Sequence, residues 1–171
     1  MNIQHALLSE HSKKQINKIA DYIGSNPLRF KELMHLFFHS EYRTTQRAAW
    51  VMSICATNHP SLITPYLNKM IDNLKKPVHD AVKRNTVRVL QHIDIPTKLM
   101  GKTADICFEL LTTPSEAIAI KAFSMTVLMN ITKKQPDFKT ELRILIEDQL
   151  PYSSAGFLSR AKKTLKELDK L

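Results

Sequence analysis

The chain has 171 residues, of which 43% are hydrophobic and 24% are charged, and this balance is typical of a single soluble globular domain. It contains only three glycines, which argues against folds built on hairpin turns and against a glycine-rich phosphate loop. The formal net charge of +9 permits an acidic protein, a nucleic acid or an anionic surface as partner, and selects none of them.

Capping residues and prolines mark helix boundaries along the chain. The segment S-K-K-Q at 12–15 is a capping box, the motif in which a serine hydroxyl accepts a hydrogen bond from a backbone N–H three residues later. It opens a predicted helix over 12–24. Prolines close later helices, because proline cannot continue a helix and moves the residue before it out of the helical region. Four helix pairs are predicted after the first helix, over 28–40 and 42–57, 61–76 and 78–92, 97–113 and 115–134, and 137–149 and 153–170.

An internal repeat is the strongest signal in the sequence. Pro77, Pro114 and Pro151 each follow an apolar helical segment and lie 37 residues apart. Equivalent positions in the first helices of the pairs form mostly apolar columns. One column contains Leu33, Met70, Cys107 and Ile144, and the next contains Met34, Ile71, Phe108 and Leu145. Because apolar columns at helical spacing let each pair bury a face on the next, the pattern predicts a stacked helical repeat.

The second helices share a motif that points to a known class of repeat. Each carries an early basic residue followed by small and apolar positions, in the segments RAAWVMSI, RNTVRVL, KAFSMTVL and RAKKTL. With the proline-delimited pairs, this resembles the HEAT or armadillo class over about 28–170. The resemblance implies an all-α fold, a right-handed α-α superhelix (α-solenoid) of about four HEAT-like helix pairs plus an N-terminal helix, in one domain over 1–171. It also implies that second helices line a concave side, in an architecture that mostly hosts binding surfaces.

Most of the excess positive charge falls on the second helices, where a basic residue recurs at the equivalent position of each pair. These residues form a basic column of Arg47, Arg84, Lys121 and Arg160. In one interpretation these residues pair with nearby groups and tie neighbouring repeats together, as Asp80 and Arg84 could at a spacing of four. In the other they bind an acidic partner, since Arg47 and Arg160 have no evident acidic mate in their own helix. The two interpretations are compatible. The candidate partner-binding residues are Arg47, Trp50, Arg84, Arg88, Lys121 and Arg160.

These observations favour a non-catalytic binding or scaffold module whose basic concave face binds an acidic protein. The alternative is sequence-nonspecific nucleic-acid binding through the same face, which lacks an evident stacking platform of aromatic residues. A remote third hypothesis is a base-repair enzyme. Trp50, Asp80, Arg84 and Arg88 resemble, in residue type, the aromatic, acidic and basic groups with which HEAT-like alkylpurine DNA glycosylases hold lesions.

No catalytic, cofactor or metal motif is predicted. Glu32, His35 and His39 share one helical face, but that face opposes the apolar one, so we expect a solvated surface in place of a metal site. Cys55 and Cys107 fall in apolar helical patterns, which predicts buried free thiols and a reducing compartment. The first residues lack the apolar core of a signal peptide, and no apolar stretch is long enough to span a bilayer. The expectation is therefore a cytoplasmic protein with no membrane partner.

Overall fold

The computed structural model describes residues 1–171 and contains α-helices and short 3-10 helices but no strand. The all-α fold class predicted from the sequence is confirmed. The chain forms two compact units, unit 1 over Met1–Val89 and unit 2 over Leu90–Leu171, and each is described by itself. The assignment of 1–171 to a single repeat domain stays a prediction.

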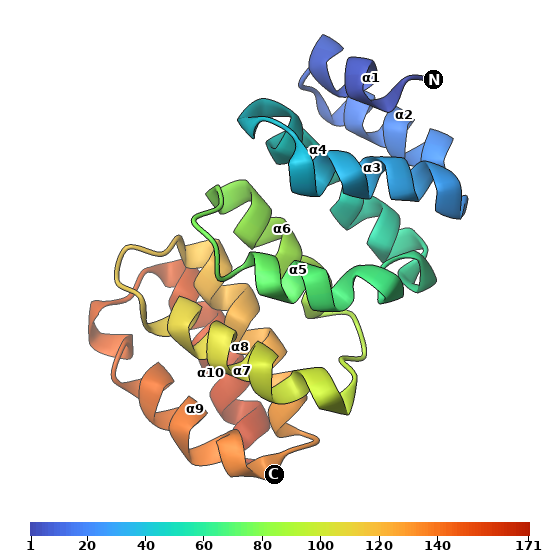
Figure 1. Cartoon of the computed structure of the whole chain (residues 1–171). Helices are drawn as coiled ribbons and strands as arrows, with labels where there is room; N and C mark the ends of the chain where they lie inside the picture. The colour runs from blue at the N-terminus through green and yellow to red at the C-terminus, as the bar shows by residue number, and fades with distance from the viewer. The chain divides into compact units, whose positions relative to one another are not determined.

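Unit 1 is blue to green in Figure 1. Its helices are α1 (Ile3–Ser9), α2 (Lys13–Ile23), α3 (Pro27–His39), α4 (Tyr42–Asn58), η1 (Pro60–Leu62), η2 (Thr64–Tyr66), α5 (Leu67–Asn73) and α6 (Asp80–Leu90), the last of which ends one residue beyond the unit. The centre of this unit is α4, which packs against α1, α2 and α3. Small residues on α4, among them Ala48, Ala49 and Ser53, are buried and allow the neighbouring helices a close approach.

The first helix, α1, was not predicted from the sequence. The side chain of Asn2 caps it by accepting a hydrogen bond from the N–H of His5 at 2.9 Å. Such a cap satisfies one of the backbone donors that a helix start leaves free. Ile3 and Leu7 are completely buried, so tertiary packing stabilises a helix too short to be stable alone. With α2, it forms an additional helix pair ahead of the four predicted ones.

The predicted capping box at the start of α2 is present in part. The hydroxyl of Ser12 accepts a hydrogen bond from the N–H of Gln15 at 3.1 Å. The side-chain amide of Gln15 does not return to the cap, however, and instead donates to the carbonyl of Ala6 at 2.8 Å. The glutamine thereby joins α2 to α1.

The segment predicted as one helix over 61–76 is broken. Pro60 and Pro65 open the two 3-10 helices η1 and η2, and the α-helix α5 begins only at Leu67. Proline lacks the backbone N–H and clashes with the preceding turn inside an α-helix. Pro65 therefore replaces the first half of the predicted helix with tighter turns.

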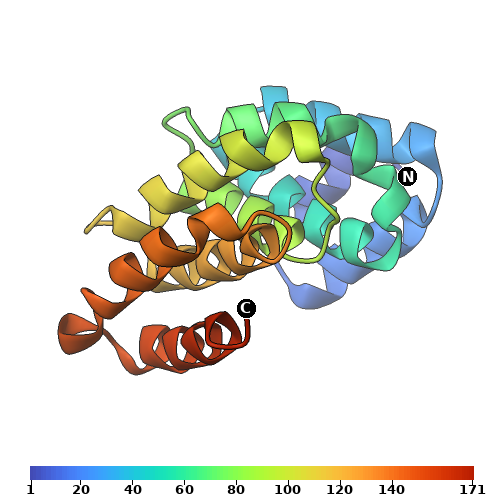
Figure 2. The same ribbon diagram turned by 90° about the horizontal axis from the view of Figure 1, so that it is seen from below.

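Unit 2 is yellow to red in Figure 1. Its helices are α7 (Thr97–Thr112), α8 (Ile118–Thr132), η3 (Pro136–Phe138), α9 (Lys139–Glu147), η4 (Leu150–Tyr152) and α10 (Ala155–Leu168). The core helix is α8, which packs against α7 and α10 and is apolar on most of its circumference, as a helix covered on several sides must be. In Figure 2, α9 and α10 run side by side in orange and red.

The apolar columns are buried except at their last members. Leu33, Met70 and Cys107 have no exposed surface, whereas Ile144 at the equivalent position is 50% exposed. Leu145, which ends the next column, is only partly buried. The first helix of the last pair thus presents apolar surface that its counterparts bury.

Candidate functional site

Arg47 lies in the second turn of α4 and joins that helix to α1. Its Nη1 donates a hydrogen bond to the carbonyl oxygen of Leu7 at 2.6 Å. This carbonyl belongs to the last turn of α1, where backbone acceptors have no partner within the helix and a cation is favoured by the helix dipole. The Nε of Arg47 is buried without a hydrogen-bond partner. The guanidinium of Arg47 is therefore engaged in contacts within unit 1.

Trp50 follows Arg47 by about one turn of α4 and is partly buried. Its ring meets the ring of His11, in the α1–α2 connection, edge to face with 5.9 Å between centroids. Such an aromatic pair contributes packing energy, so Trp50 helps to hold the α1–α2 connection against α4.

Two further members of the basic column also form bonds within their unit. In unit 2, Nη1 of Arg160 on α10 donates to the hydroxyl of Thr126 on α8. Lys121, in the first turn of α8, donates through Nζ to Oε1 of Gln149 at 3.3 Å. Arg160 thus links the second helix of one pair to that of the preceding pair.

Arg84, the remaining member of the basic column, differs from those three, and so does Arg88, one turn later on the same helix. Both are exposed on α6, and neither guanidinium forms a hydrogen bond or an ion pair within unit 1. Asp80, one turn before Arg84, is exposed and does not pair with it. On the opposite face of the same helix, Val82 and Val89 are almost completely buried. The two arginines therefore project into solvent from a helix that is fixed by its apolar side.

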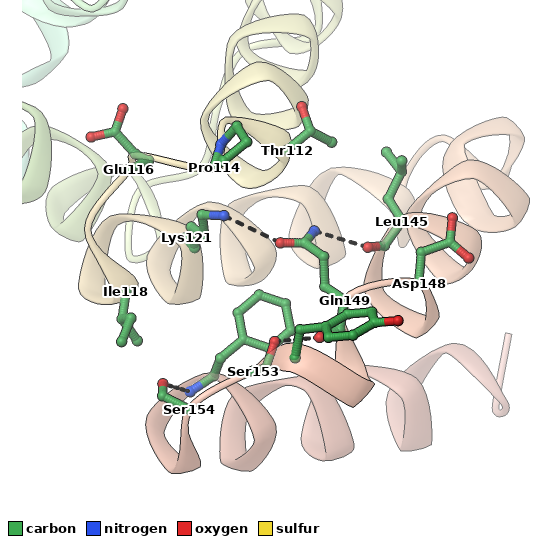
Figure 3. A pocket seen from close by; sticks show the side chains of 12 residues that line it. Thr112, Pro114, Glu116, Ile118, Lys121, Leu145, Asp148, Gln149, Ser153 and Ser154 are labelled. Carbon is green, nitrogen blue, oxygen red and sulfur yellow. Dashed lines mark hydrogen bonds between the residues drawn. The ribbon is translucent and has the colours of Figure 1, made fainter.

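A pocket of about 600 Å³ opens in unit 2 beside Lys121, between the α7–α8 turn, the end of α9, η4 and the start of α10 (Figure 3). Gln149 is one of the lining residues. Its side chain accepts a hydrogen bond from Nζ of Lys121 and donates one through Nε2 to the carbonyl of Leu145 at 2.9 Å. Tyr152 and Ile118 lie in its lining and are 92% and 47% exposed. The lining thus combines the ammonium of Lys121 with the carboxylates of Glu116 and Asp148 and with exposed apolar surface, so it carries no excess of positive charge.

The residues of this pocket other than Lys121 were not predicted as site residues. Tyr152 and Gln149 stand on either side of Pro151, in a break between helices. An exposed aromatic residue in such a break is a feature of contact surfaces. Sequence alone does not show whether that aromatic ring packs inward or outward.

The three residues considered as metal ligands lie together on one exposed face of α3. Glu32, His35 and His39 are exposed on α3, and no group of three or more His, Cys, Asp or Glu side chains is placed to hold a metal ion. The nearby ammonium of Lys69, 3.1 Å from Nε2 of His39, lowers the pKa of that histidine.

Cys55 and Cys107 are buried free thiols, as predicted from their apolar setting. Burial raises the pKa of each to about 12. A thiol with such a pKa stays protonated at neutral pH and is a poor nucleophile or metal ligand. No helix combines the length and apolarity that crossing a membrane requires.

Comparison with known proteins identifies the family to which this helical architecture belongs. The family model of the HEAT repeat domain matches residues 3–168. No curated protein and no solved structure matches the chain. The family match includes α1, in agreement with the helix pair that α1 and α2 form. HEAT repeats generally serve as scaffolds for protein interaction and are typically non-catalytic. The chain, with its stacked helix pairs and its recurring basic residue, belongs to the HEAT repeat domain family.

Proposed function

We propose that this protein is a non-catalytic binding module that holds an acidic protein partner through basic side chains of its second helices. The observation that carries the proposal is a division among the basic residues of the second helices. Arg47 and Arg160 bond to neighbouring helices, whereas Arg84 and Arg88 are exposed without a partner in their unit. The first two build the stack, and the second two are available for recognition.

The spacing of Arg84 and Arg88 supports recognition of carboxylates. Residues four apart on a helix have their Cβ atoms about 5–6 Å apart, and like charges at this spacing repel each other. An acidic segment that offers one carboxylate to each guanidinium relieves this repulsion. Arginine also forms two parallel hydrogen bonds to a carboxylate, which gives the contact orientation as well as charge.

The rigidity of α6 supports the same function. Because Val82 and Val89 are buried, the helix cannot rotate to withdraw its arginines without exposing apolar surface. The guanidinium groups are therefore presented on a fixed helical face. A contact that is positioned before binding loses less conformational entropy when the complex forms.

Selection from a displayed library of random peptides tests the proposal. We expect the selected peptides to be enriched in Asp and Glu, and the double charge reversal Arg84→Glu/Arg88→Glu to abolish their binding. The matched control is Lys14→Glu/Lys18→Glu, which makes the same change of charge at exposed positions four apart on α2. Selected peptides without an excess of acidic residues, or equal loss in the two variants, would contradict the proposal.

Nucleic-acid binding through the same arginines is the other candidate, and direct titration with oligonucleotides separates the two. Anisotropy titrations with labelled single- and double-stranded oligonucleotides, at low and near-physiological salt, measure this binding directly. Phosphate contacts release counterions, so affinity for a nucleic acid falls steeply as salt rises. Tight oligonucleotide binding that is lost in Arg84→Glu/Arg88→Glu would replace the acidic protein with a nucleic acid.

A further inference from the structure

A second basic site lies in unit 2 and contains no member of the basic column. A pocket of about 590 Å³ is lined by Lys133, Lys163, Lys166, Lys170, Glu167 and Leu171. The lysines at 163, 166 and 170 follow one another at spacings of three and four on α10 and its end, so they lie on one face. Lys133, directly after the end of α8, completes the ring.

The positive charge of this pocket is only partly neutralised. Glu167 is the one acidic side chain in its lining, and it accepts a hydrogen bond from Nζ of Lys133 at 2.7 Å. That bond and the nearby charges of Lys163 and Lys170 lower the pKa of Glu167. The next carboxylate, Asp169, is held by Arg143 of α9 at 2.5 Å. Four ammonium groups thus share one glutamate, and an anionic ligand would find an attractive potential.

The pocket also has an apolar component. The side chain of Leu171 is 49% exposed and lies in the lining. Lysine side chains carry four methylene groups that pack along apolar surface while the ammonium stays in water. A ligand that suits the pocket therefore has carboxylates around an apolar group, which a phosphate group alone does not offer.

We propose that this lysine pocket binds a short acidic peptide segment in which Asp or Glu residues flank one apolar side chain. The apolar side chain packs on Leu171 and the lysine methylenes, and the carboxylates pair with Lys163, Lys166 and Lys170. The inference rests on the proposed function, because it assigns a second contact to the same class of acidic partner. It uses different residues in a different unit, so the two can fail separately.

Anisotropy titrations with two labelled peptides test the pocket in the full chain. One peptide contains glutamate and leucine, and the other replaces each leucine with serine at the same net charge. We expect the first to bind more tightly. Because Lys163→Glu/Lys166→Glu turns two attractive charges into repulsive ones, it should weaken this binding about tenfold or more. A tenfold loss corresponds to about 1.4 kcal/mol of binding free energy. Leu171→Ser is expected to remove the preference for leucine while leaving affinity for the serine peptide unchanged.

The control variants separate the possible failures. Lys14→Glu/Lys18→Glu carries the same charge change and should bind as the parent does, and circular dichroism of each variant verifies the helical fold. Binding that is lost in Arg84→Glu/Arg88→Glu but retained in Lys163→Glu/Lys166→Glu overturns the pocket and leaves the proposed function intact. Absence of binding to either peptide overturns the pocket, whereas the proposed function is overturned only by the selection from the peptide library. Equal affinity for the two peptides, or stronger binding of an oligonucleotide that Lys163→Glu/Lys166→Glu abolishes, overturns the acidic-apolar ligand.

Discussion

Replacing Arg47 with alanine tests whether the basic column stabilises the stack. The substitution removes the hydrogen bond from Nη1 to the carbonyl of Leu7 and the partly buried side chain that delivers it. It also removes the buried Nε that has no partner. The first two changes destabilise the fold, and the third stabilises it.

The three contributions can be compared in magnitude. A hydrogen bond from a charged donor contributes about 1.5–3 kcal/mol, and each buried methylene group about 0.8 kcal/mol. Leaving a buried donor unsatisfied costs about 1–3 kcal/mol, which the truncation recovers. We therefore expect Arg47→Ala to lower the free energy of unfolding by about 2 kcal/mol. Arg47→Met keeps most of the apolar stem and should cost less than about 1 kcal/mol.

Urea denaturation of the variants measures these differences, and hydrogen exchange shows where they arise. Amide protection should fall first in α1, because that helix loses the partner of its last turn. Arg84→Ala is the matched control, since that arginine is exposed and unpaired within its unit, and it should change stability by less than about 0.5 kcal/mol. If Arg47→Ala and Arg84→Ala were equally stable and α1 kept its protection, the structural role assigned to Arg47 would be wrong.

Three further predictions concern caps and ionisable groups. Ser12→Ala should destabilise the chain by about 1 kcal/mol in urea, because it removes the N-cap of α2. Cys55 and Cys107, whose pKa values burial raises to about 12, should react with a thiol reagent near neutral pH only after unfolding. Their ionisation in the unfolded chain should lower stability as pH rises from about 9 towards 12. The ion pair of Glu167 with Lys133 lowers the pKa of that glutamate, so its stabilising effect should be present above the ordinary glutamate pKa and disappear as pH falls below it. Comparing acid denaturation of the parent chain with that of Lys133→Ala measures this effect.

The sequence predicts the helix pairs well because their boundaries depend on local chemistry. A proline cannot continue the interior of an α-helix, and the apolar columns indicate a buried face through simple periodicity. The prediction missed α1 because the N-cap Asn2 is its main local signal, and a helix of 7 residues depends mainly on tertiary burial for its stability. The predicted helix over 61–76 also runs through Pro65, because the apolar periodicity continues past that residue. Proline nevertheless interrupts an α-helix there.

The candidate site was less predictable, for a geometric reason. Residues at the same position of successive repeats have the same surroundings only if the neighbouring element offers the same acceptor. Arg47 meets a helix-terminal carbonyl, Arg160 a threonine hydroxyl and Lys121 a glutamine amide. These acceptors belong to residues whose distance along the chain ranges from 28 to 40, so no local pattern identifies them.

Charge alone is therefore a poor guide to where a HEAT repeat protein binds. A basic residue that recurs with the repeat can serve the stack, and its charge is then not available to a partner. We therefore propose that a partner binds residues that the stack leaves without an acceptor, as at Arg84, or that fall outside the repeated position, as in the lysine pocket. A net charge of +9 would attract any polyanion over a distance of about one Debye length, but selectivity requires fixed groups with unsatisfied hydrogen-bonding capacity. The difference between bonded and unbonded members of one column is thus stronger evidence for a recognition surface than the total charge.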